Sequence, residues 1–558
     1  MQRLVFIFLA FLLVAAHASA VPKTTLMKED VGYCNVFDGQ PTAQRTGTTI
    51  AARITALAGA PCTLVLGGRP SELPGAWTVS STLIIPDTIT LLIPDGTTIT
   101  GAGALTIPRL LASTHHGWYT GTGVLTIIQY LHSPQPVLLP AILCNDTGNQ
   151  APGINAAIAA IPANGAIILL PTGICRITQA LSTIPAGSTL KGYGRFATTL
   201  MMTSATATAI TLSGNGAAVR DFTLDGSGRT TGIGILATNA GQQYLIEGVY
   251  VARQGIGIQN EGAATEIRNT LVDHCVSSGI YLNGNARSQD EVHVINVQSN
   301  NNGGHGLLIV GGTPGAAGAG IRIDKYTAAG NVGTGLLSNP GTSGWSVGAV
   351  WINDLELSGN GINLQISAGL NSLGWVIHGG LYESAANWNV YLDGGYHILT
   401  GAVITNAGTV TPGNGMGIAA AGNDIVIANN IVLTNAQAGV AFGAASSNIT
   451  LSNNEIRQNG IGLRFDPGST AVVVVGGRMI SNTTLYLNAI PTGSIIAAVQ
   501  GFDNFLQGGV QTSAPTAGTA KTWKLGAAAV VSPTAPNRTI EVEVDGVTLY
   551  ISAKTTNN

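Results

Sequence analysis

Five acidic and basic residues interrupt a glycine-rich, repetitive stretch of this chain at corresponding points. A few residues ahead of recurring Gly-Ile phrases stand Asp225, Arg253, Asp273, His274 and His305. If successive repeats stack ~4.8 Å apart, these side chains share one edge. Two carboxylates roughly 5–9.5 Å apart could hydrolyse a glycosidic bond, whereas a base beside a cation could abstract a proton from a uronate sugar. The alternative is a set of solvated turn residues, because exposed turns collect polar side chains.

Aromatic and polar residues beside the same phrases could bind a substrate. Tyr281, Asn283 and Tyr391 are predicted to line the cleft, because aromatic rings offer sugars a stacking surface. Alternatively, the aromatic side chains fill the core. Asp290 and Glu291 end a polar insertion and could bind Ca²⁺ through oxygen ligands, or the insertion is a solvated loop.

The phrase Gly-(Ile/Leu/Val)-x-apolar organises these residues, because it recurs at intervals of 21 to 29 residues. A short β-rich phrase followed by a second strand-like run, with length variation confined to the turns, predicts a solenoid of strands. The sequence therefore predicts an all-β parallel β-helix. The phrase begins at Gly232, Gly255, Gly279, Gly306, Gly335, Gly361, Asn389, Gly415, Gly439 and Gly460.

Asparagines also recur near one turn of successive repeats. Stacked asparagine side chains can hydrogen-bond one another and the backbone, so we expect a structural ladder rather than a site. The predicted ladder contains Asn302, Asn331, Asn360, Asn406, Asn435, Asn459 and Asn482.

Two amphipathic segments precede strand-like runs in the first third of the chain. Ile50, Ile54 and Leu57 have helical spacing in Thr48–Gly59, and a similar pattern fills Gly153–Ala163. Helices there would cover the open end of a β-helix core and its strand edges.

The domain organisation follows from these patterns. We predict a signal peptide at 1–20, an N-terminal helix-capped unit at 21–139, the β-helix at 140–510, a linker at 511–521 and a C-terminal β module at 522–558. The module has two strand-like runs around an Asp-Gly turn.

Composition limits the classes of partner. The chain has 558 residues, 75 of them Gly, with 9% charged residues and a net charge of −3, so it lacks a basic footprint for nucleic acid. Arg3, the apolar run Leu4–Ala15 and the small residues Ala18-Ser19-Ala20 predict a cleaved export signal, with an N-terminal anchor as the alternative. The mature chain is therefore expected to be secreted, extracellular or periplasmic, and free of the membrane.

Export makes disulfides possible. Cys34 and Cys144 are both followed by Asn at the head of similar segments, which favours the pairs Cys34–Cys62 and Cys144–Cys175 and leaves Cys275 buried. The alternative is five thiols packed in a core.

Three segments resemble the start of the pectate-lyase-like β-helix domain found in secreted polysaccharide enzymes and phage tailspikes. They are Asn155-Ala156-Ala157-Ile158, Ile168–Gly173 and Leu190-Lys191-Gly192-Tyr193-Gly194, and Val219–Gly226 fits the same domain. The resemblance implies a right-handed coil, in agreement with the crossover rule, and a possible homotrimer. It leaves the activity open, because one fold carries many functions.

Two shorter phrases resemble particular enzymes of that group. Gly304-His305-Gly306 is similar to a phrase of polygalacturonases, but Arg253-Gln254-Gly255 and Ser277-Ser278-Gly279 stand where those enzymes carry carboxylates. Val272-Asp273-His274-Cys275 resembles a phrase of pectate lyases in which the Asp lies near calcium.

The combined hypothesis is a secreted polysaccharide-binding protein that degrades an acidic or plant-type glycan as a lyase or hydrolase. Asp273 would act as ligand or acid/base, His274 and His305 would handle protons or contact substrate, and Arg253 would recognise a carboxylate. The alternative is a non-catalytic surface, adhesive or tailspike-like β-helix, which the missing paired carboxylates favour.

Overall fold

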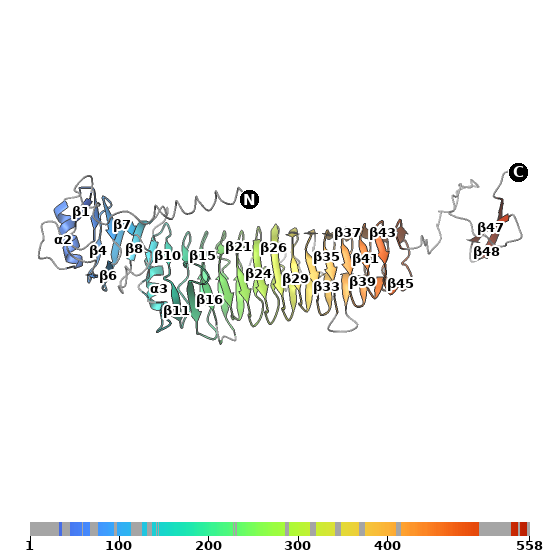
Figure 1. Ribbon diagram of the computed structural model, residues 1–558, viewed down its shortest axis with the longest axis horizontal. Coiled ribbons are helices and arrows are strands. Elements are labelled where there is room, and N and C mark those ends of the chain that lie inside the picture. The colour runs from blue at the N-terminus through green and yellow to red at the C-terminus, as the bar shows by residue number, and fades with distance from the viewer. Residues whose placement is uncertain are drawn as a thin grey trace, which may run out of the picture. The chain divides into compact units, whose positions relative to one another are not determined.

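The computed structural model shows a chain built almost entirely of β-strands (Figure 1). Its two compact units divide between Phe505 and Leu506. The predicted signal at 1–20 and linker at 511–521 lie outside the described residues. The structure describes residues 33–35, 45–57, 60–66, 76–93, 97–112, 125–130, 137–140, 142, 144–226, 228, 231–284, 290–312, 320–340, 348–367, 374–408, 415–501, 537–544 and 547–554.

The larger unit is a parallel β-helix of about 15 turns, which confirms the predicted fold class. Each coil contributes up to three short strands, and equivalent strands of successive coils pair in parallel. We call the resulting stacks the first, second and third ladders. Strands β24 (His293–Asn300) and β26 (Ile321–Ala329) run through the first and second ladders without a break.

The other strands of the first ladder are β10 (Ile167–Leu169), β12 (Thr189–Lys191), β15 (Ala218–Arg220), β18 (Leu245–Glu247), β21 (Glu266–Arg268), β28 (Val350–Asn353), β31 (Trp375–His378), β34 (Ile398–Thr400), β37 (Val426–Ala428), β40 (Ile449–Ser452), β43 (Val472–Val475) and β46 (Ile495–Ala497). Those of the second are β11 (Gly173–Ile177), β13 (Thr198–Met202), β16 (Thr223–Asp225), β19 (Tyr250–Ala252), β22 (Leu271–Asp273), β29 (Glu356–Ser358), β32 (Leu381–Glu383), β35 (Val403–Thr405), β38 (Ile431–Leu433), β41 (Glu455–Arg457) and β44 (Arg478–Ile480). The third ladder consists of β14 (Ile210–Leu212), β17 (Ile233–Ala237), β20 (Ile256–Asn260), β23 (Ile280–Asn283), β25 (Leu307–Val310), β27 (Thr334–Asn339), β30 (Ile362–Ile366), β33 (Trp388–Leu392), β36 (Met416–Ala420), β39 (Ala438–Phe442), β42 (Ile461–Phe465) and β45 (Thr484–Leu487).

The repeated phrase forms the third ladder, but in two registers rather than one. Pairing of Ile258 with Ile280 aligns Gly279 with Gly257, two residues after Gly255. We expected every phrase to occupy the same position in its coil. In half of the repeats the phrase begins two residues earlier than in the others. The hydrophobic pattern cannot reveal this difference, because a shift of the strand by two residues keeps every side chain on the same face.

The observed register aligns small residues in one column that faces the interior of the β-helix. A Cβ on Gly257 would come within 2.5 Å of the Gly279 carbonyl and 2.4 Å of a Val272 methyl, so the backbone there has no room for a side chain. Asparagine replaces glycine at only two of its positions. The column is Gly234, Gly257, Gly279, Gly306, Gly335, Asn363, Asn389, Gly417, Gly439 and Gly462.

The predicted asparagine ladder is confirmed with one correction. Amide groups form a buried hydrogen-bonded chain at the corner after the second ladder, with Nδ2–Oδ1 distances of 2.7–3.2 Å. Asn406 lies outside this chain and accepts a hydrogen bond from Thr434 Oγ1 at 2.8 Å. Ala385 and Ala407 occupy the corner there, and the two asparagines of the glycine column fill the space. The chain runs through Asn302, Asn331, Asn360, Asn363, Asn389, Asn435, Asn459 and Asn482.

Two helices precede β-strands, as predicted. Helix α2 (Gly47–Leu57) buries Ile50, and α3 (Ala151–Ala159) buries Ile154, Ala157 and Ile158. Neither helix has the length and hydropathy of a membrane span. A disulfide joins Cys144 to Cys175 on β11, beside α3.

The N-terminal strands enclose a second, smaller core. Strand β9 separates the two cores, because Val137 packs into the small core and Leu138 into the large one. Backbone pairing places Cys34 opposite Leu64, two residues from the buried Cys62, and the Cys34–Cys62 disulfide stays a prediction. The strands are β1 (Tyr33–Asn35), β2 (Cys62–Val65), β3 (Ala76–Thr78), β4 (Leu83–Ile84), β5 (Ile89–Ile93), β6 (Thr98–Thr100), β7 (Leu105–Ala112), β8 (Leu125–Tyr130) and β9 (Val137–Leu139).

The smaller unit contains an antiparallel pair, β47 (Asn537–Val544) and β48 (Val547–Lys554). Val544 pairs with Val547, so the two strands meet around the predicted Asp-Gly turn, whose residues lie outside the described part of the chain.

Candidate functional site

Asp225 and Asp273 occupy the same position of the second ladder. Asp225 pairs with Ala252, and Ala252 pairs with Asp273, so the two acids lie two coils apart. At ~4.8 Å per coil their backbones are ~10 Å apart. Both residues end their strands where the chain turns towards the third ladder.

In three successive coils that follow Asp225, the residue after the second ladder adopts a left-handed backbone conformation that makes this corner. Arg253, His274 and Asn301 have φ values of 54°, 53° and 52° at equivalent positions. Non-glycine residues rarely adopt this conformation, and here the hydrogen bonds of neighbouring coils hold it in place. The corner thus stacks a cation, an imidazole and an amide along the coil axis.

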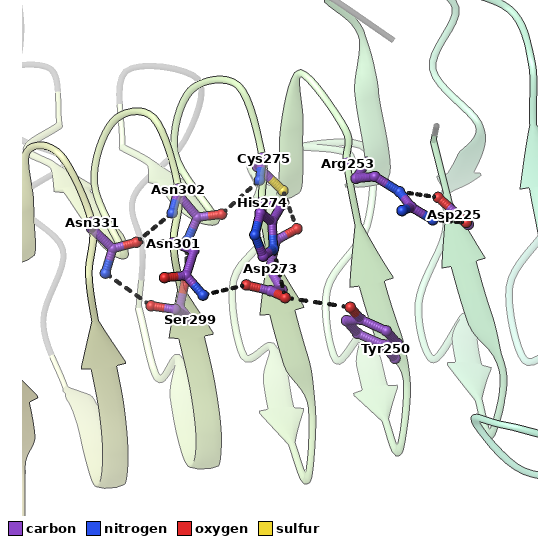
Figure 2. A network of polar contacts seen from close by, with 10 residues as sticks. All are labelled: Asp225, Tyr250, Arg253, Asp273, His274, Cys275, Ser299, Asn301, Asn302 and Asn331. Atoms are coloured by element: carbon purple, nitrogen blue, oxygen red, sulfur yellow. Dashed lines mark hydrogen bonds and ion pairs between the residues drawn. The ribbon is translucent and has the colours of Figure 1, made fainter. Parts of the chain in front are cut away.

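Arg253 binds Asp225 across adjacent coils (Figure 2). Its Nε lies 2.9 Å from Asp225 Oδ1, and its Nη2 donates to Oδ2. The hydrogen bond to the Asp225 carboxylate raises the pKa of the guanidinium. Arg253, predicted to recognise a carboxylate of the substrate, already holds one of the protein's own.

Asp273 is the centre of the second cluster in Figure 2. His274 Nδ1 lies 2.8 Å from Asp273 Oδ2, and the Asn301 amide donates to Oδ1 at 3.2 Å. The His274 side chain is 61% exposed and that of Asp273 only 18%, so the carboxylate lies beneath an imidazole that faces solvent. A carboxylate that holds Nδ1 orients the ring and leaves Nε2 for an incoming proton.

Tyr250 and Asn301 are the members of this cluster that were not predicted from the sequence. The Tyr250 hydroxyl lies 3.4 Å from Asp273 Oδ2. Burial, followed by the neighbouring Asp273 charge, raises the pKa of the Tyr250 hydroxyl. The signal was available in the strand period, because Tyr250 stands two residues before Ala252, the pairing partner of both acids.

His305 lies outside this network, two residues before β25 of the third ladder. Its Nδ1 accepts a hydrogen bond from the Thr334 backbone at 3.0 Å, and burial lowers the pKa of the imidazole. In the described residues, no hydrogen bond or ion pair links it to Asp273 or His274. The expectation that all five residues gather on one turn therefore holds for four, while His305 stabilises the start of the neighbouring strand.

Tyr281 and Tyr391 share one outward column of the third ladder, four coils apart. Between them, the same position of the ladder is occupied by Leu308, Leu337 and Gln365. The Tyr281 hydroxyl donates to Asn283 Oδ1 at 3.1 Å, whereas the Tyr391 ring stacks on Trp388 at 4.8 Å. These three residues lie on the third ladder, whereas Asp273 lies on the second. Their predicted role in substrate binding stays a prediction.

The calcium site at Asp290 and Glu291 stays a prediction. Among the residues that the structure describes, no group of three or more His, Cys, Asp or Glu side chains could hold a metal ion. Part of the insertion before Asp290, residues 285–289, lies outside that set.

The sequence matches no protein-family profile and no curated protein sequence. Solved structures similar to it include the A-module of mannuronan C-5 epimerase AlgE4 from Azotobacter vinelandii, at 17% identity and TM-score 0.46, over 64% of this chain and 97% of that module. The N-terminal fragment of bacteriophage phi29 gene product 12 gives 12% and 0.49, over 65% and 72% of the two chains. The catalytic unit of an α-1,3-glucanase from Streptomyces thermodiastaticus gives 15% and 0.42, over 65% and 67%.

The chain's own geometry defines its fold class. Parallel strands stack in three ladders, left-handed corners join them, and an asparagine chain runs through the interior. This is the parallel β-helix fold of the pectate-lyase-like proteins that the sequence motifs resemble.

Proposed function

We propose that this protein binds a polysaccharide along the outer face of the second ladder and cleaves it by proton abstraction at the Asp273 corner. The observation that carries the proposal is the partly buried carboxylate of Asp273 beneath the exposed ring of His274, with Oδ2 2.8 Å from Nδ1. This arrangement suits a general base, which needs an oriented imidazole with one free nitrogen.

Each neighbour of this pair has a role in an elimination reaction. His274 Nε2 would take the proton next to the carboxylate of a uronate sugar, and the adjacent glycosidic C–O bond would break as the C=C double bond forms. The Tyr250 hydroxyl, whose raised pKa keeps it protonated, could return a proton to the departing oxygen. Arg253, half-exposed on the intervening coil, adds positive charge near the developing anion.

The test is a screen of pectins, alginate and other glycans by reducing-sugar release and by absorbance at 235 nm, the signature of the new double bond. Wild-type protein should cleave an acidic glycan. His274→Ala and Asp273→Asn should each lose at least about 99% of that activity, as expected for a general base and its orienting partner. Asp324→Asn is the matched control, since its carboxylate accepts from Asn353 on the first ladder at 2.6 Å. Activity retained in both corner variants would refute the assignment.

A non-catalytic glycan-binding β-helix is the second candidate. It is favoured by the Asp225–Arg253 pair, which occupies both oxygens of the other carboxylate in this register. Saturable glycan binding without product at 235 nm or new reducing ends would select this candidate. Both candidate functions are compatible with export and with a homotrimer. Cell fractionation tests export, and light scattering of the purified protein tests the oligomeric state.

A further inference from the structure

An exposed aromatic residue lies at the margin of the candidate site. Residues Gly194–Ala197 form the turn between β12 of the first ladder and β13 of the second ladder. Phe196 in this turn is 81% exposed. Its ring centroid lies 6.5 Å from that of Tyr250 at an angle of 59°. Phe196 thus belongs to β13's coil but reaches a strand two coils further on.

The turn that carries Phe196 is firmly held. The Gly194 amide donates to the Asp221 carbonyl at 2.8 Å, and the Ala197 and Thr198 amides both donate to the Gly194 carbonyl. The Thr223 hydroxyl donates to the Arg195 carbonyl. Exposure of the ring is therefore built into the turn, although removing the ring from water would stabilise the protein.

Arg195 differs from the other arginines of this region in its partners. Arg220 and Arg268 both bind Glu247, at 2.5 and 2.8 Å, and Arg253 binds Asp225. Within the described residues, no carboxylate lies within ion-pair distance of Arg195. Its guanidinium instead lies 5.9 Å from the Phe196 ring centroid, a cation–π contact.

An exposed aromatic ring next to the Arg195 guanidinium matches one class of ligand. The C–H face of a sugar can stack on an aromatic ring, and a uronate carboxylate on the same sugar can pair with arginine. A neutral sugar would use only the ring. The Phe196 ring lies beside Tyr250, two coils further on, and the Tyr250 hydroxyl lies 3.4 Å from Asp273 Oδ2 in the coil after that, so a bound chain could continue from this turn to the corner.

We infer that Arg195 and Phe196 form a binding subsite for a uronate residue of an anionic polysaccharide, upstream of the Asp273 corner. The inference rests on the proposed function for the position of the bond to be cleaved, but the binding itself does not require cleavage. Phe196 supplies the stacking surface, and Arg195 selects the charged sugar.

Binding of oligogalacturonate and oligomannuronate, with a neutral glucan oligomer for comparison, is measured by calorimetry on the full chain. Phe196→Ala and Phe196→Leu should each weaken binding roughly three- to tenfold, the size of one aromatic contact. Arg195→Ala should weaken uronate binding, reduce its salt dependence and leave neutral-sugar binding unchanged. Trp351→Ala is the matched control, because Trp351 is 42% exposed and also lies 5.9 Å from an arginine, Arg322, but on the first ladder.

The outcomes separate this inference from the proposed function. Uronate binding that weakens in the Phe196 and Arg195 variants supports the subsite, even if the wild-type protein releases no product. Cleavage by the wild type with unchanged binding and kcat/KM in these variants overturns the subsite and leaves the corner intact. Absence of uronate binding by the wild type also overturns it. Thermal unfolding of Phe196→Leu checks that the turn still folds.

Discussion

The Asp225 carboxylate receives two hydrogen bonds from the Arg253 guanidinium of the following coil. Asp225 is nearly buried, with 11% of its side chain exposed, whereas 53% of Arg253 is exposed. The pair fastens the second ladder at the position where two acids share a register. It also separates two roles, because Asp225 is committed to the fold and Asp273 is left with the histidine.

Arg253→Ala should destabilise the protein by about 1–2 kcal/mol, because it leaves a buried carboxylate without its donors. The double variant Asp225→Asn/Arg253→Ala should recover part of this loss, since the amide it leaves carries no charge. Urea-unfolding midpoints of the two single variants and the double variant form a thermodynamic cycle. Additive effects in the cycle would show that the ion pair contributes nothing.

Asn331→Ala should destabilise the β-helix by about 2–3 kcal/mol. The change removes a buried amide that accepts from the backbone and side-chain N–H groups of Asn302 and donates to Asn360 Oδ1 and the Ser299 carbonyl, so four buried polar groups each lose a hydrogen bond. Asn406→Gly is the control, because Asn406 lies outside the chain and its φ of 58° suits glycine. The urea-unfolding midpoint of Asn331→Ala should be clearly lower than that of Asn406→Gly. Equal midpoints would show that the asparagine chain does not contribute to stability.

Gly257→Ala should also destabilise the protein, by about 1–3 kcal/mol, because the new methyl group would meet the Gly279 carbonyl and Val272. Gly395→Ala provides the comparison, since the nearest atom to its new methyl group would be 3.8 Å away. Thermal unfolding of the two variants tests whether the glycine column, rather than glycine content in general, sets the packing of the third ladder.

The fold followed from the sequence because its signals repeat. Alternating apolar residues and regular glycines predicted the ladders, and the asparagine series predicted the interior chain. The register could not be read in the same way, because Gly255 and Gly257 fit the phrase equally well and a shift of two preserves the buried face. Asn406 was assigned to the ladder for a different reason, because the length of each turn is not fixed by the sequence and a difference of one residue exchanges Asn406 with Ala407.

The site followed only in part, because single residues carry no repeat. Asp273 and His274 are neighbours in the sequence, so their contact needed only the corner conformation. His305 stands immediately before Gly306, whereas Asp273 stands six residues before Gly279, and the alignment of these two glycines therefore places the histidine beyond the corner. Tyr250 and Phe196 were missed because their importance comes from contacts between coils.

Stability should fall as pH is lowered from about 7 through 6, partly because of His305 and His397. Burial lowers the pKa of both imidazoles below the ordinary value of about 6.5 that applies in the unfolded chain. Between the two pKa values the unfolded chain binds more protons, so acid favours unfolding, and the effect is absent above about pH 7.5. Protonation would also end the hydrogen bond from Thr334 to His305 Nδ1.

His305→Asn together with His397→Asn should flatten this pH dependence. Urea midpoints at about pH 5.5 and about pH 8 measure it, and the loss of stability between them should be smaller in the double variant than in the wild type. His378→Asn is a suitable comparison, because that side chain is exposed at the end of β31. An unchanged slope in the double variant would assign the pH dependence to other groups.

Tyr250→Phe should separate catalysis from binding at the corner. The change deletes only the hydroxyl 3.4 Å from Asp273 Oδ2 and keeps the ring against Phe196, so uronate binding should persist. If the hydroxyl returns the proton to the departing sugar oxygen, kcat should fall by about 100-fold with little change in KM. A rise in KM at constant kcat would instead make Tyr250 a substrate contact, and the proton donor would have to be sought elsewhere on the second ladder.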